Sequence, residues 1–192
     1  MAHTGENIIE NEKVNKKLLI ALTVIYIILL IWVIVFKCNY NEGLHIETNR
    51  SMTLLERLEY KKVPFEKFIE AVKDGGILAL VEIIALFFNV ICFLPFGGFL
   101  RFFTDKKWLI VVCSALFSLG VEVFQLFSCW GGPDYIDIIS NTLGALFGIF
   151  IYDFVRPKIS GELINKIAKW AVGIFTPVAI FAIINSIINF PG

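Results

Sequence analysis

Five stretches of the chain are each apolar enough and long enough to cross a lipid bilayer as a helix. They cover residues 18–36, 77–103, 108–130, 136–155 and 167–190. A membrane-spanning helix needs about 20 predominantly apolar residues. We therefore predict an all-α, polytopic membrane helix bundle of about five transmembrane helices, with one amphipathic extracytoplasmic loop.

The composition supports a bilayer as the solvent of this chain. Hydrophobic residues make up 57% of the 192 residues and charged residues 18%, whereas soluble domains average about 45–50% and about 25%. The formal net charge is zero, so nucleic acid is not expected as a partner. The first apolar stretch is too long for a signal-peptide core and lacks a small-residue cleavage site, so we expect it to be retained as an anchor.

Lys and Arg residues gather at alternate ends of these stretches and so predict an orientation. They precede the first stretch (Lys13, Lys16, Lys17), separate the second from the third (Arg101, Lys106, Lys107) and separate the fourth from the fifth (Arg156, Lys158, Lys166, Lys169). The connection 128–135 contains neither residue type. Because cytoplasmic loops are enriched in Lys and Arg, we predict a multi-pass protein of the cell membrane with a cytoplasmic N-terminus and an extracytoplasmic C-terminus.

This pattern divides the chain into three parts. Residues 1–17 form a cytoplasmic tail, residues 18–155 form the main membrane domain, and residues 156–192 form a cytoplasmic linker and the last transmembrane helix. The main domain includes an outer loop at 37–76. Two cysteines, Cys38 and Cys129, stand at predicted outer helix ends, where either a disulfide or two free thiols would be compatible with an oxidising compartment.

The outer loop carries two helical signals. Thr53 and Glu56 have the T-x-x-E spacing of a capping box, which opens a helix. A second stretch has apolar residues at helical spacing (Phe65, Phe68, Ile69, Val72). Such a stripe fits either an amphipathic helix lying in the membrane interface or a small soluble cap packed on the bundle.

Carboxylates and amides interrupt three of the apolar stretches. They are Glu82 and Asn89 in the second, Glu122 and Gln125 in the third, and Asp137 and Asn141 in the fourth, with Asp134 just before it. An ionisable side chain costs about 2.5–3.5 kcal/mol at the bilayer centre and usually marks a functional site. At 1.5 Å per residue, most of them lie within roughly 10 Å of the outer helix ends; Asn89 is expected nearer the midplane.

The spacing places each pair on one face of its helix. Glu122 and Gln125 are three residues apart, and Asp137 and Asn141 are four apart, which are neighbouring positions on a helix surface. We predict that Glu122, Gln125, Asp134, Asp137 and Asn141 converge in one pocket open to the outside, and that Asn89 also belongs to this binding pocket. Hydrogen-bonded contacts between helices remain an alternative for the two asparagines, and Glu82 is either an addition to the pocket or an interfacial acid.

The remaining polar and small residues suggest structural roles. Asp153 is expected to be a solvated end charge near Arg156. Pro95, followed by Gly97 and Gly98, predicts a kink, because proline removes one helical hydrogen bond. Gly144 and Gly148 form a G-x-x-x-G pattern that permits close helix approach, and we expect that contact to lie within the chain.

Several of these residues together resemble the VanZ-like family of membrane proteins. The segment from Asn89 through Pro95 to Gly97 is similar to the family's N-x-x-x-F-x-P-x-G, and Glu122 with Gln125 is similar to its E-x-x-Q. The third motif, D-x-x-D-x-x-x-N-x-x-G, is matched by Asp134, Asp137, Asn141 and Gly144, with Gly148 following. The similarity runs from about residue 18 to residue 155.

Two departures from the family pattern bear on function. The family often carries an arginine before the first aspartate of the third motif, where this chain has Gly131, Gly132 and Pro133. It often has a third acid directly before Asp137, where this chain has Ile136. A function that needs a cationic partner or three acids is therefore not supported by these positions.

The resemblance implies a role at the cell envelope, since the family is named after a member linked to teicoplanin resistance. Our leading hypothesis is a protein that binds or modulates a lipid head group, a lipid-linked wall precursor or a lipophilic glycopeptide, with membrane lipids as partners. The alternative is an intramembrane hydrolase or transferase acting on a lipid head group, with Glu122 as general acid or base. A small transporter fits less well, because no inverted repeat is visible.

No cofactor follows with certainty from the sequence. Neither histidine lies in a predicted span, and the cysteines lack metal-ligand spacing. Glu122, Asp134 and Asp137 could hold a divalent cation such as Mg²⁺ or Ca²⁺, because hard cations take oxygen ligands. The same carboxylates could instead pair with protein amides.

Overall fold

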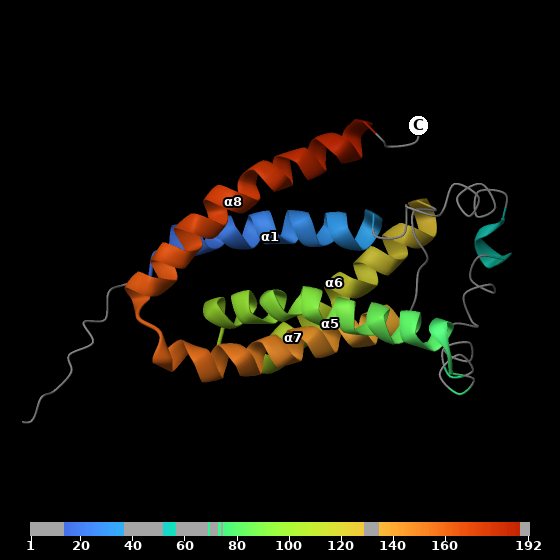
Figure 1. The fold of residues 1–192 in the computed structure, drawn as a ribbon, viewed down its shortest axis with the longest axis horizontal. Helices are drawn as coiled ribbons and strands as arrows, with labels where there is room; N and C mark the ends of the chain where they lie inside the picture. Colours follow the sequence, from blue (N-terminus) through green and yellow to red (C-terminus); the bar gives the residue numbers. More distant parts are fainter. Residues whose placement is uncertain are drawn as a thin grey trace, which may run out of the picture.

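The structure is a computed structural model that describes residues 14–36, 52–56, 69, 73, 75–128 and 135–188. Its long helices are α1 (Lys16–Phe36), α5 (Ile77–Phe103), α6 (Lys107–Ser128), α7 (Tyr135–Val155) and α8 (Gly161–Ile188), with the short 3₁₀ helix η1 (Arg156–Lys158) between the last two (Figure 1). All five long helices are long and apolar enough to cross a membrane. The predicted five-helix membrane bundle is confirmed.

The helix bounds differ from the expected ones mainly at α8, which begins at Gly161 rather than near residue 167. Ser160 precedes it, and its Oγ accepts a hydrogen bond from the Leu163 backbone N–H at 3.2 Å, as an N-capping side chain does. Lys166 and Lys169 therefore lie on the helix instead of in a linker. Both are exposed, so their long side chains can reach the polar interface.

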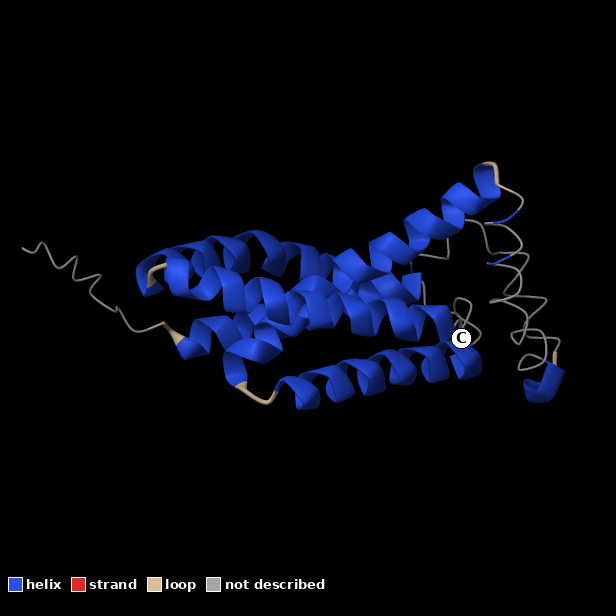
Figure 2. Ribbon diagram, turned by 90° about the horizontal axis from the view of Figure 1, so that it is seen from below, coloured by secondary structure: helices blue, strands red, loops and turns tan. Residues whose placement is uncertain are grey.

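The helices run along a common direction, so the bundle has two ends (Figure 2). At one of them α1, α6 and α8 begin and α5 and α7 end; we call it the basic end. Every Lys and Arg of the five long helices and η1 lies towards this end. The opposite end joins α6 to α7 and carries the end of α8 (Figure 1).

Glycines bring α5 and α7 into backbone contact. A Cβ added at Gly148 would lie 2.0 Å from the Leu94 carbonyl oxygen, and one at Gly97 would lie 1.9 Å from the Ala145 carbonyl oxygen. The G-x-x-x-G pattern thus serves a contact within the chain. α5 stays helical through Pro95, so the proline does not break it.

The other helices pack around this pair. α6 packs mainly on α7, and α8 packs along α1. Tyr26 of α1 donates a hydrogen bond to the Cys92 carbonyl oxygen at 2.5 Å, and its ring centroid lies 5.4 Å from that of Phe99 in a tilted contact, which fixes α1 against α5. The core between α1, α5 and α6 includes Phe93 and Phe96.

An ion-pair network joins three helices at the basic end. Asp153 of α7 pairs with Arg101 of α5 at 2.8 Å and with Lys107 of α6 at 2.7 Å. Arg101 also contacts Asp105. The expectation of a solvated end charge near Arg156 is therefore wrong: the connection 104–106 is short enough to bring both cations onto the α7 carboxylate.

The outer loop is described only in part. Thr53 and Glu56 form the predicted capping box: the Thr53 backbone N–H donates to Glu56 Oε2 at 2.7 Å, and the Glu56 N–H donates to Thr53 Oγ1 at 3.3 Å. These hydrogen bonds hold the pKa of the Glu56 carboxyl below its usual range. The apolar stripe at 65–72, apart from Ile69, and both Cys38 and Cys129 lie outside the described residues.

Candidate functional site

The polar side chains of α5, α6 and α7 are buried. Asn89, Glu122, Gln125 and Asn141 are each at most 5% exposed. Their burial is unusual because amides and carboxylates are among the residue types most often found at the surface. The contacts of each buried side chain show where it lies in the bundle.

Asn89 of α5 donates a hydrogen bond from Nδ2 to Oδ1 of Asp137 on α7, at 2.5 Å. Asn89 is twelve residues from the start of α5, whereas Asp137 is only two residues from the start of α7. α5 therefore extends beyond α7 at the end opposite the basic end. The expectation that Asn89 lies near the midplane is wrong, since Asp137 holds it near the start of α7.

This offset also changes the place of Glu82. The apolar part of α5 that is suited to span a membrane begins at Ile83, so Glu82 lies just outside it. Its side chain, like Asp134, lies outside the part of the chain that the structure describes. Whether either residue joins the site stays a prediction.

Asn141 of α7 donates a hydrogen bond from Nδ2 to Ser118 Oγ of α6 at 2.8 Å. Ser118 and Ser114 are fully buried, and neither is among the residues predicted for the site. Ser114, Ser118 and Glu122 follow one another at four-residue spacing, and Gln125 continues the same stripe. That spacing is the signal that could have predicted a polar face on α6 from Ser114 to Gln125.

Gln125 connects this face to α1. Its Nε2 donates to the Ile34 carbonyl oxygen at 3.4 Å. Gln125 Oε1 and Asn141 Oδ1 are buried and accept no hydrogen bond from the residues that the structure describes. A buried acceptor without a donor costs free energy, so both oxygens are suited to receive a hydrogen bond from a bound group.

Glu122 lies on the buried face of α6, one turn from both Ser118 and Gln125. It is six residues from the end of α6, and Asn141 is six residues from the start of α7. At 1.5 Å per residue, both lie roughly 9 Å inside those ends. The two carboxylates and three amides thus occupy the half of the bundle opposite the basic end.

The described residues include no cluster of three or more His, Cys, Asp or Glu side chains suited to hold a metal ion. Asp134, one of the three predicted ligands, is outside those residues. The described groups of this region that could bind a cation are two carboxylates and several neutral amides and hydroxyls. A divalent cation there stays a prediction.

The comparisons with known proteins decide the family. The VanZ/LLP1 family model matches residues 23–156, which contain every candidate site residue named above. The chain belongs to the VanZ/LLP1 family. It is 26% identical over 153 residues to "Protein VanZ" of Enterococcus faecium, a match that covers 76% of this chain and 80% of that protein. No solved structure matches the chain.

This VanZ-like membrane protein therefore has its family-wide part in α1, α5, α6 and α7. The matched region ends at Arg156, the first residue of η1, so the rest of η1 and the whole of α8 lie beyond it. The resemblance found in the three motifs is confirmed. The motif residues Asn89, Gln125, Asp137 and Asn141 all take part in hydrogen bonds between helices.

Proposed function

We propose that this VanZ-like protein acts at the outer face of the cell envelope, where the polar site of α5, α6 and α7 binds or modulates a lipid head group, a lipid-linked wall precursor or a lipoglycopeptide antibiotic. The site comprises Asn89, Glu122, Gln125, Asp134, Asp137 and Asn141. The observation that carries the proposal is the burial of Glu122, Gln125 and Asn141 together within apolar helices. Orientation with the basic end in the cytoplasm, as Lys and Arg placement favours, faces the site outward.

The charge of the site limits the class of ligand that the site would bind. Among the five long helices and η1, Lys and Arg all lie towards the basic end, whereas Glu122 and Asp137 lie in the opposite half of the bundle. Carboxylates accept hydrogen bonds, and charge-assisted ones are the stronger kind. The site therefore favours a ligand with amine or hydroxyl donors over one that presents a bare phosphate.

A second candidate function is an intramembrane hydrolase or transferase acting on a lipid head group through Glu122, Asp134 and Asp137. The observation that favours it is the 5% exposure of Glu122, since a carboxyl group excluded from water can serve as a general acid or base. A divalent cation held by the three acids would, in that case, polarise the head group. Comparison of total lipids from membranes with and without the protein separates the two functions: a changed lipid species means catalysis, and an unchanged lipidome means binding.

The substitution Glu122→Gln tests the site. It keeps the shape of the side chain and removes an ionisable group, so we expect loss of protection in a teicoplanin-susceptibility assay, or loss of the lipid change, with expression and membrane insertion retained. Glu162→Gln, at an exposed acid at the start of α8, is the matched control and should keep full activity.

A second control separates loss of function from loss of folding. Leu116 is 61% exposed on α6, so Leu116→Gln places an amide against lipid and should lower expression. Full activity of Glu122→Gln would show that the carboxylate is structural and would contradict the proposal.

A further inference from the structure

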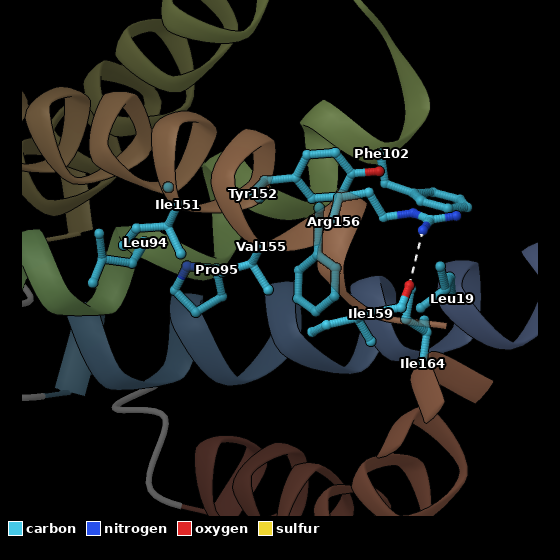
Figure 3. Close-up of a pocket in the computed structure, with 13 residues that line it drawn as sticks. Leu19, Leu94, Pro95, Phe102, Ile151, Tyr152, Val155, Arg156, Ile159 and Ile164 are labelled. Atoms are coloured by element: carbon cyan, nitrogen blue, oxygen red, sulfur yellow. Dashed lines mark hydrogen bonds between the residues drawn. The ribbon is translucent and has the colours of Figure 1, made fainter. Parts of the chain in front are cut away.

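A second feature lies at the basic end, away from the polar site. A groove of about 440 Å³ runs between α5 and α7 on one side and α1 with the start of α8 on the other. Figure 3 shows Leu94, Pro95 and Ile151 towards one part of it and Phe102 and Arg156 towards the other. Its volume is within the range of about 300–1,000 Å³ that ligand sites occupy.

The lining is apolar apart from Tyr152 and Arg156. The remaining lining residues are Leu19, Leu94, Pro95, Gly98, Phe99, Phe102, Gly148, Ile151, Val155, Ile159 and Ile164. A cavity with such walls does not hold water, and left empty it would forfeit the dispersion contacts of every side chain around it. In a bilayer the material at hand to fill it is an acyl chain.

Hydrophobicity does not select among lipids here, because lipid tails are as apolar as the walls of the groove. Selection must come from the head group, and the charged residue of the groove is Arg156. Its guanidinium donates to the Ile159 carbonyl oxygen at 3.2 Å, which leaves most of its five N–H donors for another acceptor. Arginine binds phosphate through such paired donors.

The neighbouring charges reinforce this preference. Lys158 and Lys17 are exposed at the same end, whereas Arg101 and Lys107 are held by Asp153. Basic pockets between transmembrane helices characteristically take anionic lipid head groups.

We propose that this groove is a binding site for one anionic phospholipid, with an acyl chain lying along Leu94, Phe99 and Ile151 and the phosphate at Arg156. The site is at the opposite end of the bundle from Glu122, so it does not depend on the function proposed above. It also gives α8 a role, because Ile164 closes one wall of the groove.

Native mass spectrometry of the full-length protein in detergent tests this site by titration with dioleoyl phosphatidylglycerol or dioleoyl phosphatidylcholine. We expect the first phosphatidylglycerol to bind about tenfold more tightly than the first phosphatidylcholine. Arg156→Gln should remove that preference, whereas Lys169→Gln, at an exposed lysine of the same end, should keep it. Soluble glycerol phosphate should not compete, because it lacks the acyl chain.

A second variant tests the groove itself. A Cβ at Gly98 would meet only the Gly148 carbonyl oxygen, at 3.7 Å, so Gly98→Leu should project into the groove and weaken the first binding event of both lipids. Gly173→Leu, where a Cβ meets nothing within 4 Å, is the control. Equal affinity for the two lipids in the wild type, or an unchanged first affinity in a folded Gly98→Leu variant, would overturn the proposal and identify the bound lipids as a nonspecific annulus.

Discussion

Asn89 and Asn141 each form a hydrogen bond that crosses from one helix to another. Asn89 reaches Asp137, and Asn141 reaches Ser118. The sequence left open whether these asparagines line a site or join helices. Their contacts show that both join helices, while the buried Oδ1 of Asn141 accepts no hydrogen bond from the described residues.

The strength of the Asn141–Ser118 contact can be measured by a double-mutant cycle. Within membranes such hydrogen bonds average about 0.6 kcal/mol and reach about 1.7 kcal/mol, because the unfolded state also finds partners. We expect a coupling energy in that range for Asn141→Ala combined with Ser118→Ala, measured by reversible unfolding in mixed micelles. Zero coupling would show that the two side chains do not interact in the membrane.

At the scale of the helices, the contact between α5 and α7 depends on glycines, whose lack of a side chain allows the two backbones to touch. Gly148→Ala would place a Cβ 2.0 Å from the Leu94 carbonyl oxygen, so the helices must separate. We expect the free energy of unfolding to fall by about 1–3 kcal/mol, the usual cost of overpacking. This loss should appear as a lower melting temperature in detergent. Gly120→Ala, where a Cβ meets nothing within 4 Å, should leave the melting temperature unchanged or raise it.

The ion-pair network at the basic end is the second contact between elements that invites a test. The Asp153 side chain is 28% exposed and serves both Arg101 and Lys107. Removal of the Asp153 charge should lower the free energy of unfolding by about 1–3 kcal/mol, between the values for surface pairs and for broken buried pairs. We expect Asp153→Asn to lower thermal stability in detergent by that amount.

Asp105→Asn is the control for this network, because the Asp105 side chain is 97% exposed although it also contacts Arg101. Its effect on stability should be within about 0.5 kcal/mol, as for other exposed pairs. Equal effects of the two variants would mean that Asp153 does not tie α7 to α5 and α6.

At the scale of the whole molecule, the two ends of the bundle differ in charge, and the positive-inside rule predicts that the basic end is cytoplasmic. We predict that Ser128→Cys, in a background without the four native cysteines, reacts with a membrane-impermeant maleimide on intact cells. Lys106→Cys should react only after lysis. The reverse pattern would place the basic end outside and turn the candidate site towards the cytoplasm.

What the sequence alone determined is the number of spanning helices and the family. Both depend on local properties, since the length and hydropathy of a stretch decide whether it can cross a bilayer, and motif spacing is carried in the chain itself. The bounds of α5 are as expected, and those of α6 and α7 agree within the described residues. The T-x-x-E capping box was equally predictable, because its partners are three residues apart.

The tertiary structure decided the relative positions along the helices. Counting residues from its own helix end placed Asn89 near the midplane, but the glycine contacts set α5 and α7 in a register that brings Asn89 beside Asp137. Asp153 pairs with Arg101 and Lys107 because of the same register, since ion pairing depends on how neighbouring helices are offset. The groove at the basic end likewise exists only where α1, α5, α7 and α8 meet. A groove is formed by packed surfaces of several helices, so no single helix encodes it.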